Sequence, residues 1–219
     1  MRHFRPVFLE RWLYPEAIFR IRTTEKVLYL TFDDGPDPVS TRQLLSILKP
    51  HDIKAMFFCT GKKAEEYSYL MNDIRAGGHI IGNHGYKHYN GWRTDPVKYI
   101  NDVIRASDFT SDKIFRPPFG KLSNKQRKRL PKSFKLIFWD IMAYDFDTTF
   151  GGLKSLRILQ KKMRPGSIIV LHDTVTSCAN AIIGEFLTYA IRAGYRFELL
   201  EELFLTHPPT SSLKYKGKG

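Results

Sequence analysis

Cysteines and long apolar runs are both scarce in this chain of 219 residues. The two cysteines, Cys59 and Cys178, lie far apart, and Cys59 ends an apolar run, so we expect it to be a small buried residue and expect no disulfide framework. Residues 1–22 contain no uninterrupted apolar core. We therefore expect no secretory signal and no membrane-spanning helix in these residues. We therefore expect a cytoplasmic protein or one at the inner membrane face, with an extracytoplasmic place left open.

Acidic residues are also few, with 22 Asp and Glu against 35 Lys and Arg and a net charge of +13. Such a balance favours polyanionic partners in general. Nucleic acid is not an expected partner, because no recognised binding motif accompanies the charge. Residues 1–25 form a basic, aromatic leader that we expect to pack on the domain, with peripheral contact to an anionic membrane as the alternative. Residues 206–219 are expected to be a flexible basic tail.

Short apolar runs and helix-like stretches alternate along the rest of the chain, without an internal repeat or a linker. Helices are expected at 41–49, 62–76, 96–108, 153–163 and 181–193. Strands are expected at 27–30, 54–59, 79–82, 114–116, 135–139, 167–171 and 195–199. This alternation predicts an α/β fold, a single irregular (β/α) barrel of about seven parallel strands over residues 26–205.

The chain is organised around one stretch, residues 31–36, which places Asp33 and Asp34 directly after the first apolar run. Gly35 and Pro36 then stop the strand from continuing. Ligands of α/β folds gather at the carboxyl ends of parallel strands. The two acids are therefore candidate site residues, although a turn with one capping Asp would also explain an isolated pair.

Two histidines follow the third expected strand at a spacing of four, His84 and His88. One helical turn or a compact loop would aim both imidazoles at one point. Together with Asp33 and Asp34 they offer one carboxylate and two imidazoles, a ligand set that leaves a divalent metal open positions for water and substrate.

Other strand ends carry further polar residues. Arg116 precedes a rigid Pro-Pro turn, and an arginine there could hold a carboxylate with two hydrogen bonds. Acids follow the fifth strand at Asp140, Asp145 and Asp147. His172 ends the sixth strand and could titrate near neutral pH. Polar groups at successive strand ends indicate one shared site.

The order of these motifs resembles the polysaccharide deacetylases, the carbohydrate esterase family 4 with the NodB-homology domain. The matching motifs are residues 31–36, 84–88, 116–120, 145–146 and 171–173. The resemblance implies that Asp33 is the general base. It also implies a divalent metal, Zn before Co, Ni or Mn, held by Asp34, His84 and His88.

The remaining roles follow from the same resemblance. Arg116 would orient the general base, His172 would be the general acid, and Asp145 would tune the acid and the base. The backbone N–H of Phe119 would help to bind the oxyanion, and Leu171 would line the acetyl pocket.

Some positions depart from the family pattern. Gly85 stands where relatives have Ser or Thr, so a hydroxyl that would brace the metal loop is missing. Phe119 replaces a common Tyr, Phe146 a common Trp, and Met142 stands where many relatives have an acid. None of these changes removes a predicted ligand or proton-transfer group.

The resemblance implies hydrolysis of the N-acetyl amide of N-acetylglucosamine units in a glycan, such as peptidoglycan or a chitin-like oligosaccharide, with release of acetate. Two alternatives stay open: deformylation or deacetylation of a lipid-linked amino sugar, and a barrel that binds glycan without catalysis. The glycan, the acyl group and the oligomeric state stay open as well.

Overall fold

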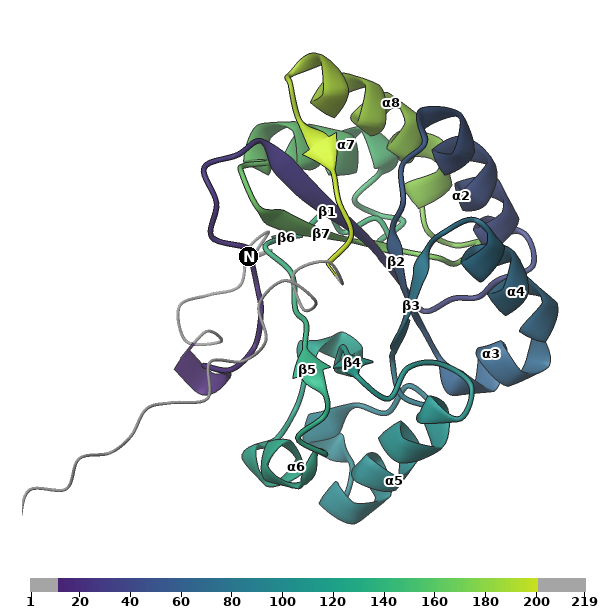
Figure 1. Cartoon of the computed structure of the whole chain (residues 1–219), viewed down its shortest axis with the longest axis vertical. Helices are drawn as coiled ribbons and strands as arrows, with labels where there is room; N and C mark the ends of the chain where they lie inside the picture. The colour runs from purple at the N-terminus through teal and green to yellow at the C-terminus, as the bar shows by residue number, and fades with distance from the viewer. Residues whose placement is uncertain (1–11, 201–219) are drawn as a thin grey trace, which may run out of the picture.

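The computed structural model describes residues 12–200, which form one curled sheet with helices around its outside (Figure 1). Every strand pairing is parallel, in the order β5-β4-β3-β2-β1-β7-β6, with β8 beside β1. The strands are β1 (Val27–Asp33), β2 (Met56–Cys59), β3 (Ile80–Asn83), β4 (Ile114–Phe115), β5 (Lys135–Leu136), β6 (Ile141–Met142), β7 (Ser167–His172) and β8 (Arg196–Phe197). The predicted α/β class and distorted (β/α) barrel are confirmed.

The strand expected at 135–139 differs from the structure. β5 ends at Leu136, and β6 is a separate strand at the opposite end of the sheet. Between them the chain crosses the opening of the barrel: the Ile137 N–H bonds to Phe115 O at 3.0 Å, and the Asp140 N–H bonds to Ile168 O at 2.8 Å. The sheet of the described residues therefore has eight strands where seven were expected.

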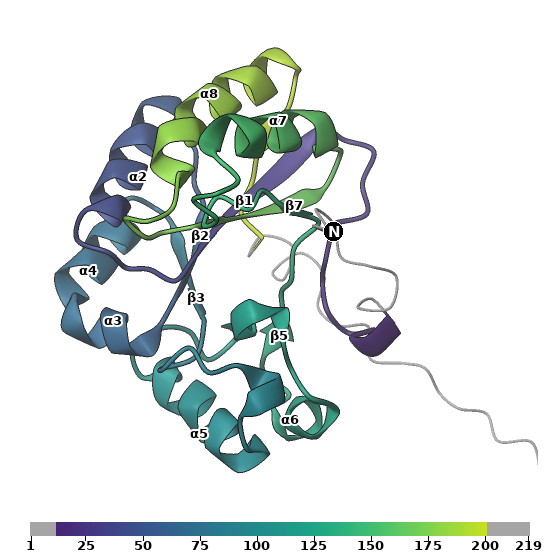
Figure 2. The ribbon, with the colours of Figure 1, turned by 180° about the vertical axis from the view of Figure 1, so that it is seen from behind.

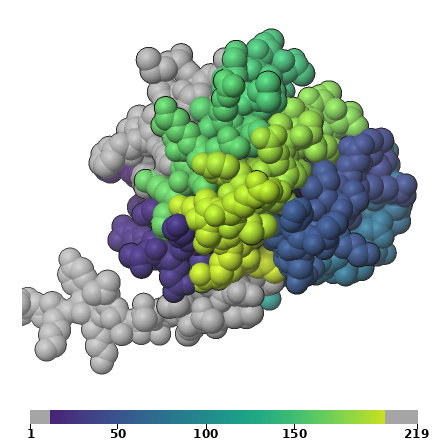
Figure 3. All heavy atoms as spheres, turned by 90° about the horizontal axis from the view of Figure 1, so that it is seen from above, coloured from purple at the N-terminus to yellow at the C-terminus, as the bar shows by residue number. Residues whose placement is uncertain are grey.

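The helices cover the outer face of the sheet, as the view from behind also shows (Figure 2). They are α2 (Ser40–Leu48), α3 (Gly61–Glu66), α4 (Ser68–Ala76), α5 (Pro96–Ser107), α6 (Asn124–Arg129), α7 (Gly152–Lys162) and α8 (Ala179–Arg192). Three short 3₁₀ turns add η1 (Lys49–His51), η2 (Gly91–Arg93) and η3 (Pro118–Gly120). Seen from above, α7, α8 and α2 lie side by side (Figure 3). None of the helices in this part of the chain is both long and apolar enough to cross a membrane.

Two predictions about helices had different outcomes. The helix expected at 62–76 is broken at Tyr67 (φ −114°, ψ 48°), and the break lets Ala64 of α3 and Leu70 of α4 both be buried. The helix expected at 96–108 is confirmed as α5, and Asp95 caps it, since its carboxylate accepts hydrogen bonds from the backbone N–H groups of Val97 and Lys98.

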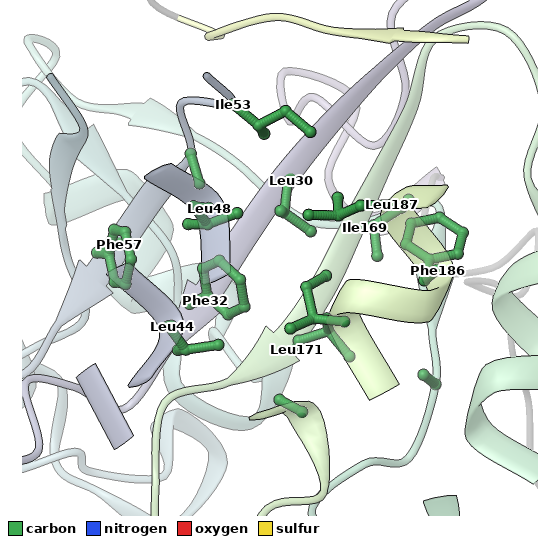
Figure 4. Packing of buried hydrophobic residues seen from close by; sticks show 14 of the residues in the cluster. Leu30, Phe32, Leu44, Leu48, Ile53, Phe57, Ile169, Leu171, Phe186 and Leu187 are labelled. Carbon is green, nitrogen blue, oxygen red and sulfur yellow. The ribbon is translucent and has the colours of Figure 1, made fainter. Parts of the chain in front are cut away.

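All seven residues of β1 are buried, and their alternation divides the core. Leu30 and Phe32 point outward into a cluster with side chains of α2 and α8 (Figure 4). Tyr29 belongs to a second cluster with residues of β2 and β7. Because side chains alternate along a strand, Thr31 and Asp33 lie on the same face as Tyr29. The last inward position of β1 is therefore the carboxylate of Asp33.

The N-terminal segment packs between the two ends of the sheet. Ile18 forms a bridge with Ile137, and Arg20 forms one with Ser167. The ring of Phe19 stacks on Phe138 with centroids 4.8 Å apart. The described part of the expected leader, residues 12–25, thus lies against the barrel. Residues 1–11 and the expected tail at 206–219 lie outside the described residues.

Candidate active site

The carboxyl ends of the strands bring the predicted site residues together. Asp33 ends β1 and is the register partner of His172, which ends β7. His84 follows β3, and Arg116 follows β4. A cavity of about 350 Å³ opens at this end of the barrel. Its lining includes six of the predicted residues: Asp33, Asp34, His84, His88, Phe119 and His172.

Three side chains at the cavity form a group that could hold a metal ion. Asp34 Oδ1 lies 3.0 Å from His88 Nε2 and 3.4 Å from His84 Nε2. The three ligand atoms lie within 4.8 Å of one another. Asp34 Oδ1 is buried and makes no hydrogen bond, although burial of an unpaired carboxylate oxygen is costly. A divalent cation fits this donor set.

A hydrogen bond on its other ring nitrogen fixes the His84 ring for this purpose. Its Nδ1 lies 2.8 Å from the backbone carbonyl oxygen of Arg116, so Nδ1 carries the proton and donates it. Nε2 is then left with its lone pair facing Asp34. Burial alone would raise the pKa of Asp34, but the adjacent imidazoles of His84 and His88 outweigh it and hold that pKa well below its ordinary value. The carboxylate is therefore ionised and ready to bind a cation.

The loop that carries the two histidines is held by acceptors on neighbouring elements. The backbone N–H of Gly85 donates to Asn83 Oδ1 at 2.8 Å. The Asp102 carboxylate on α5 accepts from the N–H groups of Tyr86, at 2.8 Å, and Lys87, at 3.0 Å. The loop, which has no hydroxyl at position 85, is thus braced by the Asp102 carboxylate on α5, which sequence analysis did not identify.

Arg116 is buried completely and holds Asp33 in place. One guanidinium nitrogen donates to Asp33 Oδ1 at 2.6 Å and to Thr31 Oγ1 at 2.7 Å. The others donate to the carbonyl oxygens of Ile137 and Phe138. The Asp33 carboxylate is therefore paired and fixed in direction, with Oδ2 lying 3.9 Å from His84 Nε2.

His172 is paired with a second buried acid. Asp145 Oδ1 lies 3.0 Å from His172 Nδ1, and Asp145 Oδ2 accepts hydrogen bonds from the His172 backbone N–H and from Ser177 Oγ. Burial lowers the pKa of His172, but nearby carboxylates, chiefly that of Asp145, together raise it by a larger amount. The net result is a pKa of about 9. The imidazole is therefore protonated at neutral pH, with Nδ1 donating to Asp145.

Of the two residues predicted to contribute to the substrate pocket, Phe119 lines the cavity and Leu171 does not. Phe119 adopts a left-handed backbone conformation (φ 60°) and is 57% exposed, and its ring lies edge-on to the His88 ring with centroids 4.5 Å apart. The expectation that Leu171 lines an acetyl pocket is contradicted, because its side chain is fully buried in the outer core near Phe186 (Figure 4). Alternation along β7 puts Val170 on the face of His172 instead.

Sequence analysis also overlooked several lining residues. Trp139 and Lys121 line the cavity, as do Met142 and Phe146, which it had noted only as departures from the family pattern. Asp140, by contrast, lies apart from the cavity lining, because its carboxylate pairs with Arg164 and accepts from Ser167.

Known proteins resemble this chain in sequence and in fold. A polysaccharide deacetylase family profile matches residues 20–133. A peptidoglycan-N-acetylglucosamine deacetylase of Bacillus cereus is 33% identical over 152 residues, which are 66% of this chain and 55% of that protein. The chain thus spans about half the length of that relative.

Two solved structures resemble the chain as a whole. A peptidoglycan N-acetylglucosamine deacetylase, solved with a naphthyl N-hydroxybenzamide bound, has a TM-score of 0.81 at 27% identity, over 90% of this chain and 97% of that one. A pseudoenzyme of the same esterase family from Bacillus anthracis has a TM-score of 0.77 at 23% identity, over 86% of this chain and 69% of that one, and shows the fold alone. The chain belongs to the polysaccharide deacetylase family, as the matched profile, the shared fold and the assembled motif residues indicate.

Proposed function

We propose that this protein is a metal-dependent N-deacetylase that acts on N-acetylglucosamine units of a peptidoglycan-type glycan. One observation carries the proposal: a carboxylate paired with Arg116, Asp33, and an imidazole paired with Asp145, His172, line the same cavity as the candidate metal ligands. A protein that only binds glycan has no use for a base and an acid beside a metal site. One structural neighbour is a pseudoenzyme, so the proposal has to rest on the acid and base residues and not on the fold alone.

The proton transfers follow from the two pairs. Asp33, held by Arg116, takes a proton from the water molecule whose oxygen attacks the acetyl carbon. His172 then gives its proton to the amide nitrogen as the C–N bond breaks, because an amide anion is a very poor leaving group. Acetate and a free amino sugar are the products, and the proton that Asp33 gained returns to solvent.

The metal site would be formed by Asp34, His84 and His88. A divalent ion held there would supply a Lewis acid that stabilises the oxyanion and favours ionisation of water. Two imidazoles and one carboxylate suit zinc, and they would also accept Co, Ni or Mn. The backbone N–H of Phe119 is the protein donor that we assign to the oxyanion.

The substrate assignment rests on the named relatives, because the Bacillus cereus protein and the solved deacetylase are both peptidoglycan N-acetylglucosamine deacetylases. The measurement is acetate release from peptidoglycan fragments and from N-acetylglucosamine oligomers, with the metal-free protein reconstituted with Zn or Co. We expect release that depends on metal and disappears in Asp33→Asn. Failure of the metal-loaded protein to release acetate or formate from any N-acylated sugar would exclude the proposal.

A further inference from the structure

A second hollow lies on the same part of the surface as the candidate active site. It encloses about 560 Å³ and is lined by two indole rings, those of Trp12 and Trp92. The side chains are 70% and 62% exposed, respectively, although tryptophan is usually well buried. Leu13, at 41%, adds a third exposed apolar side chain to the lining. These residues stabilise little of the core, so their exposure calls for another reason.

The hollow adjoins the catalytic cavity at one short segment. Lys121 lines the cavity, and the next two residues, Leu122 and Ser123, line the hollow. The Lys121 ammonium also lies over the Trp92 ring, 5.2 Å from its centroid. Trp92 is therefore the first aromatic ring of the hollow beside the Lys121 side of the cavity.

Hydrogen bonds and close packing hold the two segments that carry the indoles relative to each other. The Tyr14 hydroxyl, two residues after Trp12, donates to the backbone oxygen of Leu122 at 2.7 Å. Gln126 Nε2 donates to Gly91 O at 2.8 Å, directly before Trp92. A β-carbon on Gly91 would lie 2.1 Å from Lys121 O, so only glycine allows this approach. Both rings thus stand on segments that are tied to residues 121–126, and little ordering is needed before binding.

We propose that this hollow is a subsite for the sugar units of the glycan that adjoin the unit in the catalytic cavity, with Trp92 and Trp12 stacking on the sugar rings. The proposal rests on the proposed function, since a polymeric substrate must continue beyond a cavity of about 350 Å³. Binding sites for uncharged ligands combine aromatic faces with a few polar groups. Here the polar groups beside the two rings are those of Ser123, Asn124 and Arg127.

The first experiment compares long and short N-acetylglucosamine oligomers as substrates. For Trp92→Ala we expect the ratio of kcat/KM on long over short oligomers to fall about tenfold, the size of one lost aromatic contact. Trp92→Phe should recover most of the ratio, because it keeps a ring. Tyr69→Ala, which removes an exposed aromatic on α4, is the matched control and should leave the ratio unchanged. An unchanged ratio in Trp92→Ala would overturn the proposal.

The second experiment separates this proposal from the proposed function. Binding of long oligomers is measured by calorimetry with Asp33→Asn, which needs no turnover, with and without Trp92→Ala. Weaker binding in the double variant supports the subsite even if the wild type releases no acetate, a result that would count against the proposed function alone. Equal binding would overturn the subsite. A second result would also overturn the subsite: Trp92→Ala no longer sediments with anionic vesicles but binds oligomers as before. The surface would then bind a membrane.

Discussion

The carboxylate of Asp102 lies so close to Gly85 that a side chain at position 85 would require the carboxylate to shift. A β-carbon on Gly85 would lie 3.0 Å from Asp102 Oδ2, and the backbone of Gly85 has a φ of +73°, which favours glycine. The same carboxylate accepts the N–H groups of Tyr86 and Lys87. Asp102 and Gly85 therefore form a matched pair that shapes the loop between His84 and His88.

Removal of this carboxylate should weaken metal binding without touching a ligand. In Asp102→Ala the backbone N–H groups of Tyr86, which is buried, and of Lys87 lose their acceptor, and the loop no longer holds His88 in a fixed direction. Loss of such an outer partner typically costs roughly 10- to 100-fold in metal affinity. Zn competition with a chromophoric chelator measures it. Asn101→Ala, an exposed neighbour on α5, is the control, and equal affinities in the two variants would contradict the role of Asp102.

Gly85→Ala tests the other half of the pair. The added methyl group meets the Asp102 carboxylate in a left-handed backbone conformation, which costs roughly 1–3 kcal/mol for a residue with a side chain. We expect a lower urea midpoint and weaker Zn binding. In the Asp102→Ala background the same substitution should cost less, because the close oxygen is gone. Additive costs would show that the two residues do not interact.

Replacement of Arg116 should reduce stability as well as activity. Arg116→Met leaves the Asp33 carboxylate buried without its cation and leaves the carbonyl oxygens of Ile137 and Phe138 without a donor. Breaking a buried ion pair on one side typically costs about 3–5 kcal/mol. Urea unfolding at neutral pH measures the loss. In Asp33→Asn the cost of Arg116→Met should be smaller, and an equal cost would mean that the pair contributes nothing beyond its carbonyl contacts.

The sequence predicted most of the site because its residues sit at strand ends. Asp33 and Asp34 follow an apolar run and precede Gly-Pro, so their place at the carboxyl edge of the sheet could be predicted without coordinates. The His84 and His88 spacing gave the second half of the metal group. These are local signals, and the shared edge of a parallel sheet brings them together.

The residues that sequence analysis missed depend on contacts between distant segments. Asp102 lies far along the chain from Gly85 and resembles any acid on a helix, so nothing local marks it as an acceptor for the loop. Trp92 becomes notable only when Lys121 lies over its ring. The misplacement of Leu171 has another cause, because the period of two along β7 already puts Val170, and not Leu171, on the face of His172.

The two adjacent acids should respond differently to the same substitution. Asp34→Asn removes a ligand atom that faces both histidines, so we expect metal affinity to fall by about 100-fold or more, with activity lost as well. Asp33→Asn should lose activity but keep metal, because Asp33 pairs with Arg116. Metal content after dialysis, set beside acetate release, distinguishes them. Identical behaviour of the two variants would contradict separate roles for these acids.

The pair of His172 and Asp145 predicts how stability depends on pH in the metal-free protein. The folded-state pKa of His172, about 9, lies above the ordinary value of 6.5, so folding binds a proton. Its contribution is therefore complete below about pH 6.5 and is lost as pH rises through about 9, by up to roughly 3 kcal/mol. Urea unfolding from about pH 7 to beyond pH 9 measures it, above the range in which Asp173 titrates, since burial raises that pKa to about 6.

Asp145→Asn is the variant that assigns this pH dependence. It removes the carboxylate that does most to raise the pKa of His172, so we expect the stability to change much less between about pH 7 and pH 9. The Asn side chain can still accept a hydrogen bond from His172, which keeps the packing close to that of the native pair. If Asp145→Asn showed the same slope as the wild type, another group would be responsible, and His172 would not hold its proton at neutral pH for the leaving amine.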